Sequence, residues 1–289
     1  DAVTKAYDRG VNAAFIYSDE DKMDMDGGAL FDPHFKPDFN LDLLRSNNYI
    51  CHLCVVKKSL ADKAGELKTE YNGAQDHDYV LRCAEIAECV RHIPKILYHW
   101  RISDNSTAKS ASVKTYANTA GVNAVAAHIK RIGLDGKVTN GVAPGFYDID
   151  YKLEGEPFVS VIIPNKDHLE DLTRCIESME QVNNYHNLEY IVVENNSVLD
   201  ETFAGYEAME KKYGDKFKLV KWDGIFNYSA INNYGIQFAK GDYILLLNND
   251  TEVIEPDSLR RMLALCQRPN VGIVGAKLLY DDNTVQHAG

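Results

Sequence analysis

The sequence predicts an α/β fold, in which a mostly parallel β-sheet carries helices on both faces. Strand-like and helix-like segments alternate along the second half of the 289-residue chain, which is typical of parallel sheets with helical crossovers. The strand-like segments are apolar almost throughout, as expected when helices cover both faces of the sheet. Polar residues follow these strands at once, for example in GDYILLLNNDTEV at 241–253.

The elements of the second half follow from apolar periodicity. The pattern predicts strands at 158–164, 188–195, 217–223, 243–247 and within 271–282, and helices at 168–181, 228–241 and 256–269. Asp167 stands before the first of these helices as its expected N-cap, with Glu170 three residues later. Gly241 is the expected C-terminal stop of the second helix.

The first half contains similar elements in a less regular order. Strand-like segments lie at 13–17, within 50–60, and within 93–108, where a strand leads into a polar loop; helix-like segments lie at 1–10, 73–87 and 113–132. The first strand is expected to end at an acidic turn that contains Asp19 and Asp21. A Gly-rich connector at 133–145 leads to the second half, so we expect domains at 1–150 and 151–289.

Composition narrows the functional classes. A net charge of −12 argues against nucleic acid as the partner, and no apolar run approaches the roughly 20 residues that cross a bilayer. Cys51 and Cys54, in the sequence CHLC, have metal-like spacing, but no second CxxC follows. Buried thiols of a protein from the reducing cytosol are therefore the favoured interpretation of the six cysteines.

The polar residues after the strands predict a binding site. In open α/β sheets, ligands bind beyond the carboxyl ends of the strands, so the groups at 164–167, 194–197, 227 and 248–250 should share one rim. Neither GxGxxG nor a Walker P-loop is present. Acidic strand ends instead suggest a nucleotide whose phosphates are bound through a bridging metal ion.

Several motifs resemble the family 2 glycosyltransferases of the GT-A fold. VSVIIPNKD, IVVENNS, NYSAINNYGIQFAKGDYILLLNNDTEV and VGIVGAKLLYDDNTVQHAG in the second half resemble the nucleotide-binding front of such a domain. IYSDEDKMD, FKPDFNLDLLRSNNYI, GAQDHDYVLRCAE and KILYHWRISDNSTA in the first half resemble the metal- and acceptor-binding rear. The combination is similar to tandem bacterial enzymes that build O-antigen or rhamnan-type polysaccharides.

The rear half precedes the front half, which is the reverse of the family's order. The economical explanation is that the chain spans the junction of two consecutive domains, the rear of one at 1–150 and the front of the next at 151–289. Alternatively, the halves pack together as a circularly permuted GT-A-like unit.

The resemblance assigns the metal ligands and the general base. It implies Mg²⁺ or Mn²⁺ at Asp19 and Asp21, a DxD motif whose side chains point the same way on an extended chain, with a solvated acidic turn as the alternative. His99 is implied as a third ligand, and Asp250 as the ligand in the second half. Asp76 matches the family's general base, with an N-cap as the alternative. Gln75 replaces a frequent family Glu.

The resemblance also assigns the nucleotide contacts. It implies roles for Pro164, Asn165, Asp167, Glu194, Asn195, Asn233, Asn248 and Arg101. Glu194 and Asn195 stand where the family commonly carries two acids, and Arg101 is expected at the diphosphate. Turn formation and capping are the alternatives for the asparagines.

The expected activity is sugar transfer from a UDP-, dTDP- or GDP-linked donor to a carbohydrate acceptor, with inversion, in cell-surface polysaccharide synthesis. We expect a cytoplasmic protein, or one bound peripherally at the inner face of the membrane, with further glycosyltransferase domains in the same polypeptide. A non-catalytic nucleotide- or carbohydrate-binding module is the main alternative. A sugar-phosphate nucleotidyltransferase would suit the sheet, but its Gly-rich basic phosphate loop is missing.

Overall fold

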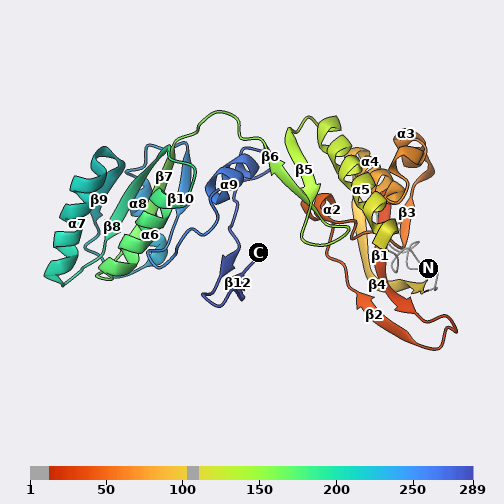
Figure 1. Ribbon diagram of the computed structural model, residues 1–289, viewed down its shortest axis with the longest axis horizontal. Coiled ribbons are helices and arrows are strands. Elements are labelled where there is room, and N and C mark those ends of the chain that lie inside the picture. Colours follow the sequence, from red (N-terminus) through yellow and green to blue (C-terminus); the bar gives the residue numbers. More distant parts are fainter. Residues whose placement is uncertain (1–12, 103–110, 289) are drawn as a thin grey trace. The chain divides into compact units, whose positions relative to one another are not determined.

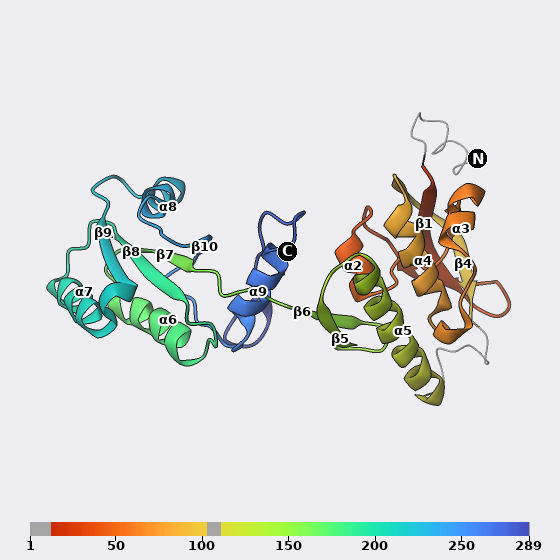
Figure 2. The same cartoon turned by 90° about the horizontal axis from the view of Figure 1, so that it is seen from above.

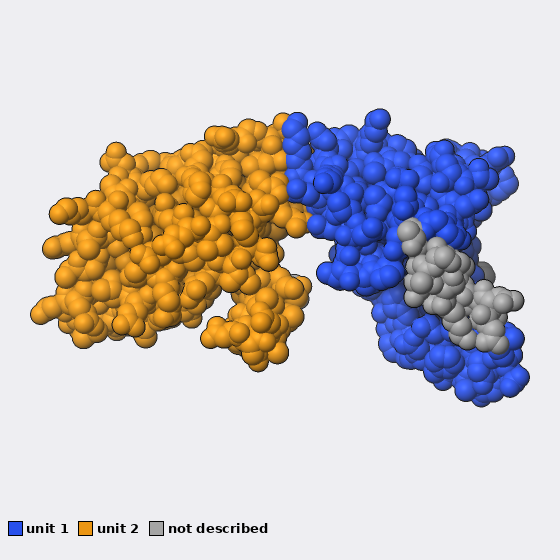
Figure 3. All heavy atoms as spheres, in the orientation of Figure 1, with its two compact units in different colours: residues 1–152 blue, residues 153–289 orange. Residues whose placement is uncertain are grey.

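The computed structural model describes residues 13–102 and 111–288, which fall into two compact units, 1–152 and 153–289 (Figure 3). Each unit has its own sheet and its own apolar core, and each is described by itself. The predicted helix at 1–10 and the polar loop at 103–108 lie outside the described residues.

Unit 1 is built on a mixed sheet with β1 (Phe15–Met23) at its centre (Figure 1). β2 (Leu30–His34) and β3 (Cys54–Val56) pair antiparallel with opposite ends of β1. β4 (Val90–Arg101) runs parallel to β1 along its whole length. The predicted strand at 13–17 was therefore too short, because β1 continues through the acids at 19–21, and the predicted strand within 50–60 shrinks to β3.

Helices cover this sheet and close its core (Figure 2). They are α2 (Leu41–Ser46), α3 (Lys58–Ala64), the 3₁₀ turn η1 (Thr69–Tyr71), α4 (Gln75–Ile86) and α5 (Ala111–Arg131). Apolar side chains from sheet and helices meet in one cluster that includes Phe15, Tyr17, Leu44, Leu81 and Val125, all at most 1% exposed. Burial of this cluster is the main stabilising contribution in the unit.

The Gly-rich segment at 133–145 is more than the predicted connector. β5 (Gly136–Asn140) lies within this segment and β6 (Tyr147–Tyr151) follows it. The two strands form an antiparallel hairpin. Tyr147 packs so closely on α5 that a Cβ at Gly121 would lie 1.7 Å from its hydroxyl. The hairpin is thus anchored to the helical layer of unit 1.

Unit 2 contains the predicted parallel sheet, in the order β10-β7-β8-β9. Its strands are β7 (Val159–Asn165), β8 (Leu188–Glu194), β9 (Phe217–Lys221) and β10 (Tyr243–Leu246). Its helices are α6 (Leu169–Gln181), α7 (Asp200–Tyr213), the 3₁₀ turn η2 (Gly214–Lys216), α8 (Tyr228–Ile236) and α9 (Ser258–Cys266). The α/β prediction with a parallel sheet is confirmed.

Two apolar clusters cover opposite faces of this sheet. Val161, Ile163 and Val192 pack with residues of α6, α7 and α9, whereas Ile162 and Ile191 pack with residues of α8. Alternate residues of one strand thus point to different helical layers, which explains the continuous apolar runs of β7 and β8.

β10 departs from the prediction of burial on both faces. It is an edge strand, and Ile244 and Leu246 are 40% and 47% exposed. The apolar stretch at 271–282 was also predicted as a strand, but only β11 (Leu278–Leu279) forms there, paired with β12 (Val285–His287). Apolar runs indicate burial only where a neighbouring element is available to cover them.

Gly241 has a different role from the predicted helix stop. α8 already ends at Ile236, five residues earlier. A Cβ at Gly241 would lie 2.5 Å from the Ser160 nitrogen and 2.8 Å from the Phe158 carbonyl oxygen. Glycine is needed here because the chain entering β10 passes directly against the backbone of β7.

Gly241→Ala is therefore expected to destabilise unit 2 by about 1–3 kcal/mol, because the added methyl group must displace backbone atoms. Urea unfolding followed by Trp222 fluorescence in a Trp100→Phe background would measure the loss in this unit. Gly272→Ala is the matched control, since nothing lies within 4 Å of a Cβ at that position. Equal stability of the two variants would contradict the close-approach argument.

Within the described residues, no helix combines the length and the apolar character needed to span a membrane.

Candidate functional site

The ends of β7 and β8 lie side by side and carry two of the predicted site residues. Asn165 and Glu194 are register partners in the parallel pairing of these strands. The Asn195 nitrogen donates to the Asn165 carbonyl oxygen at 2.9 Å. All three residues are at most 3% exposed, and Pro164 precedes them half-buried. The structure thus brings together the core of the predicted nucleotide rim.

The Glu194 carboxylate is held entirely by protein donors. It accepts hydrogen bonds from the Ser197 nitrogen at 2.6 Å, from the Ser197 hydroxyl, and from the Tyr206 hydroxyl at 2.8 Å. A buried carboxylate requires such donors to offset the loss of hydration. The geometry therefore assigns Glu194 a structural part in the rim, and its predicted contact with the nucleotide stays a prediction.

Asn195 also points into the protein. Its Nδ2 donates to the carbonyl oxygens of Trp222 at 3.2 Å and Gly224 at 3.0 Å, in the loop that follows β9. Asn196 donates to the same Gly224 oxygen at 2.9 Å. These asparagines fix the loop after β9 against the end of β8.

Asp167 was predicted to cap α6, and this prediction is wrong. His168 is the N-cap of α6, while the Asp167 carboxylate accepts from the nitrogens of Val198 and Leu199, each at 3.0 Å, just before α7. Desolvation alone would raise the pKa of Asp167, but hydrogen bonds from Leu199, Val198 and Thr202 lower the pKa overall. Asp167 therefore links the end of β7 to the start of α7.

The segment after β10 reaches the rim through Asn249, which belongs to the predicted rim group 248–250 but was not predicted to contact the nucleotide. Asn249 Nδ2 donates to Asn165 Oδ1 at 2.7 Å. Its neighbours Asn248 and Asp250 are exposed, as is Asn233 on α8. The only local sign of Asn249 in the sequence is its place between Asn248 and Asp250, because neighbouring side chains of an extended chain point to opposite sides.

In unit 1, the two acids of the predicted DxD motif lie within β1 and each has its own histidine partner. Asp19 Oδ1 lies 2.7 Å from His92 Nε2 and accepts from the Lys36 nitrogen at 3.0 Å. Asp21 Oδ1 lies 2.5 Å from His99 Nδ1, its register partner on β4. Both acids are buried, so the alternative of a solvated acidic turn is wrong.

The donor set fits a metal ion only in part. Among the described residues, no three His, Cys, Asp or Glu side chains converge on a common metal position. Asp21 and His99 are hydrogen-bonded to each other, and the carboxylate of Asp21 is a donor that suits Mg²⁺ or Mn²⁺. Asp19 is directed to His92 instead, and Asp250 belongs to the other unit. Of the three ligands predicted in unit 1, Asp21 and His99 are thus paired with each other, whereas Asp19 is paired with His92.

Asp76 lies in the first turn of α4, and the predicted alternative of an N-cap is wrong because Ala74 is the N-cap. Asp76 Oδ2 accepts from Asn48 Nδ2 at 3.0 Å, and its side chain is half-buried. The positive end of the helix dipole favours an ionised carboxylate at this position. Asn48 comes from the loop after α2, some 28 residues away in the sequence.

Asp78, two residues further on, is completely buried. Its Oδ2 accepts from Arg82 Nε at 2.9 Å and pairs with Arg82 Nη2 at 2.8 Å. Arg82 also donates to the carbonyl oxygens of Ala64, the last residue of α3, and of Glu66 just beyond it. This ion pair ties the end of α3 to α4, on which Asp76 lies.

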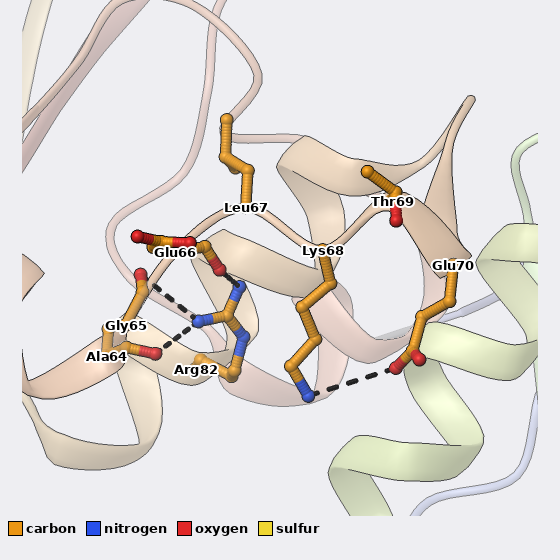
Figure 4. A pocket seen from close by; sticks show the side chains of 8 residues that line it. All are labelled: Ala64, Gly65, Glu66, Leu67, Lys68, Thr69, Glu70 and Arg82. Carbon is orange, nitrogen blue, oxygen red and sulfur yellow. Dashed lines mark hydrogen bonds and ion pairs between the residues drawn. The ribbon is translucent and has the colours of Figure 1, made fainter.

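Arg101, the predicted diphosphate contact, holds the turn between β1 and β2. Its Nη1 donates to the carbonyl oxygens of Met25 at 2.6 Å and Asp24 at 3.3 Å, and its side chain is otherwise exposed. A hollow in unit 1 lies beside Arg82 and is lined by residues 64–70 (Figure 4). It contains none of the predicted site residues, so it carries no functional assignment.

The CHLC cysteines are free thiols. Burial raises the pKa of Cys51 to about 12, and burial likewise raises the pKa of Cys54. Thiols that stay protonated at neutral pH are poor metal ligands. The interpretation as buried thiols fits Cys83 and Cys175, whereas Cys51, Cys54, Cys89 and Cys266 are half-buried.

Comparison with known proteins places this architecture in a family. The model of "Glycosyl transferase family 2" matches residues 160–287. Over 290 residues the chain is 42% identical to the uncharacterized protein y4gI of Sinorhizobium fredii, covering 99% of this chain and 32% of that protein. Over 276 residues it is 40% identical to the O-antigen biosynthesis protein RfbC of Myxococcus xanthus, covering 96% of this chain and 21% of that protein.

The chain thus spans about a third and a fifth of the lengths of these two relatives. Among solved structures, it is similar to a mannosyltransferase from Pyrobaculum calidifontis in complex with GDP-Man and Mn²⁺, at 19% identity and a TM-score of 0.38, covering 56% of this chain and 44% of that one. Residues 160–287 thus match glycosyl transferase family 2, the family predicted from the motifs.

Proposed function

We propose that this chain is part of a glycosyltransferase that transfers a sugar from a nucleoside diphosphate to a carbohydrate acceptor in cell-surface polysaccharide synthesis. The family of residues 160–287 and the 40% identity to a protein named for O-antigen biosynthesis support this proposal. The observation that carries it is the hydrogen-bonded rim at the carboxyl ends of β7 and β8, where α/β sheets bind ligands.

Unit 2 would take the nucleotide, as UDP, dTDP or GDP. Its buried rim residues are already paired within the protein, so they shape the site, whereas the exposed Asn248, Asp250 and Asn233 have side chains open to a ligand. This division differs from the sequence-based assignment, in which buried and exposed residues were expected to contact the nucleotide alike.

Unit 1 contains the candidate general base, Asp76. Asn48 Nδ2 donates a hydrogen bond to Oδ2 of Asp76. The other oxygen, Oδ1, would accept the proton of the acceptor hydroxyl. The hydroxyl oxygen forms a bond to the anomeric carbon while the bond from that carbon to the diphosphate breaks, and the diphosphate leaves with the electron pair. A single displacement of this kind inverts the anomeric configuration.

A divalent ion, Mg²⁺ or Mn²⁺, would be held in unit 1 by Asp21 and His99. In unit 2, Asp250 is the exposed carboxylate at the corresponding predicted position. Such an ion supplies charge stabilisation for a departing diphosphate.

A non-catalytic binding module is the second candidate, and two residues favour it. Gln75 and Asn248 are neutral at positions where the family often has acids, which would weaken proton transfer and ion binding respectively. Binding experiments cannot separate the two candidates, but turnover can.

Isothermal titration of the whole chain with UDP, dTDP and GDP, with Mn²⁺ or EDTA present, tests the proposal. We expect saturable heat with one of the three nucleotides, and weaker binding in EDTA. UMP, dTMP and GMP serve as controls, because they lack the terminal phosphate that an ion would contact. If none of the three diphosphates binds under either condition, the proposed function is wrong.

A further inference from the structure

One buried phenol joins the strand ends that form the nucleotide rim. Tyr206 lies on α7 and is 1% exposed. Its hydroxyl oxygen accepts from Asn165 Nδ2 at 2.7 Å and donates to Glu194 Oε2 at 2.8 Å. Asn165 ends β7 and Glu194 ends β8, so a single side chain from a third element bridges both strands.

The bridge continues on both sides. Beyond Asn165 it reaches Asn249, whose Nδ2 donates to Asn165 Oδ1 at 2.7 Å and brings in the segment after β10. Beyond Glu194 it reaches Ser197, whose hydroxyl also accepts from the Asp167 nitrogen at 2.7 Å. The network therefore connects three strand ends and the start of α7 through groups with fixed donor and acceptor roles.

The hydroxyl of Tyr206 can fill this position because it both accepts and donates. Burial is the main reason that its pKa lies above the ordinary value, so the phenol stays protonated and keeps its donor. Without the hydroxyl, Glu194 keeps only its contacts with Ser197, and the side-chain link between the ends of β7 and β8 is lost.

We propose that Tyr206 is the positioning residue of the nucleotide rim: it fixes the side chains of Asn165 and Glu194 at the ends of β7 and β8. Through Asn165 and Asn249, it holds the exposed Asn248 and Asp250 at that rim. The inference rests on the proposed function for its ligand, but the hydrogen-bond network itself does not. Tyr206 acts through other residues and does not touch the ligand.

Tyr190 provides a matched control within the same unit. It is a fully buried tyrosine on β8 whose hydroxyl donates to Glu180 Oε1 at 2.8 Å, on α6 and apart from the rim network. Tyr206→Phe and Tyr190→Phe both delete a buried hydroxyl that is bonded to a glutamate. Only the first deletion cuts the bridge between the strand ends.

The first test is the dissociation constant of the nucleotide that binds best among UDP, dTDP and GDP, measured with Mn²⁺. We expect Tyr206→Phe to weaken binding at least about fivefold, the effect of losing a well-formed hydrogen bond, and Tyr190→Phe to leave it within about twofold. Asn249→Ala, which cuts the bridge at its other end, should weaken binding like Tyr206→Phe. Equal affinities of the two tyrosine variants would overturn the inference.

A second readout needs no ligand. The Ser197 amide donates to Glu194, so its hydrogen exchange reports whether Glu194 remains in place. We expect exchange at Ser197 to be at least about tenfold faster in Tyr206→Phe and unchanged in Tyr190→Phe. If no nucleotide binds the wild-type chain, the proposed function fails while this comparison still decides the role of Tyr206; unchanged exchange in Tyr206→Phe would overturn that role.

Discussion

Asp76→Asn is expected to lower kcat for sugar transfer by about 10²–10⁴-fold, the usual contribution of a general base. The amide keeps the size of the carboxylate and an oxygen that accepts from Asn48, so the local structure should survive. It cannot take the proton of the acceptor hydroxyl, because an amide is not basic near neutral pH. Release of nucleoside diphosphate from the sugar nucleotide measures the change.

The control for this variant is Asp62→Asn on α3, an exposed carboxylate paired with the exposed Lys58. It should retain wild-type kcat, and both variants should bind the nucleotide with unchanged affinity. A kcat within about threefold of wild type in Asp76→Asn would remove Asp76 from the catalytic step. A wild-type chain that binds nucleotide without any turnover would favour the binding module.

Arg82→Leu is expected to destabilise unit 1 by about 3–5 kcal/mol, because it leaves the completely buried Asp78 without its main partner. Lys58→Leu is the matched control: Lys58 and Asp62 have the same i, i+4 spacing, but their side chains are 84% and 59% exposed. Exposed pairs of this kind contribute about 0.2–1 kcal/mol. Burial, rather than the presence of an ion pair, should therefore decide the cost.

The chain allows the two units to be followed separately in this experiment, since each contains one of its two tryptophans, Trp100 and Trp222. In a Trp222→Phe background, urea unfolding followed by fluorescence reports on unit 1. A loss below about 1 kcal/mol in Arg82→Leu would contradict this expectation and mean that Arg131, whose Nη1 lies 3.7 Å from Asp78 Oδ1, or water replaces Arg82.

The parallel sheet of unit 2 was predictable because its signals are local. β7 and β8 are continuous apolar runs, and their polar ends coincide with the turns that follow them. The site residues at these ends could be selected for the same reason. What those residues bond to could not be predicted, since the Glu194 partner Tyr206 lies on α7 among ordinary helical residues.

The errors share a physical cause: a distant segment decides the local structure. Asp19 and Asp21 look like an acidic turn, yet they continue β1 because His92 and His99 of β4 lie beside them. Asp167 looks like the cap of the helix that follows it, but the backbone of Val198 and Leu199 lies within reach. Local propensity cannot report partners that are 30 or more residues away.

The strand order of unit 2 determines which segments of the chain would bind a ligand. From β7 the chain adds β8 and β9 on one side, and then crosses back to place β10 on the other. β7 is therefore the topological switch point, where connections diverge toward opposite faces. Asn165 and Asn249 meet across this divide although 84 residues separate them, so substitutions in two remote stretches of sequence should alter the affinity for one and the same ligand.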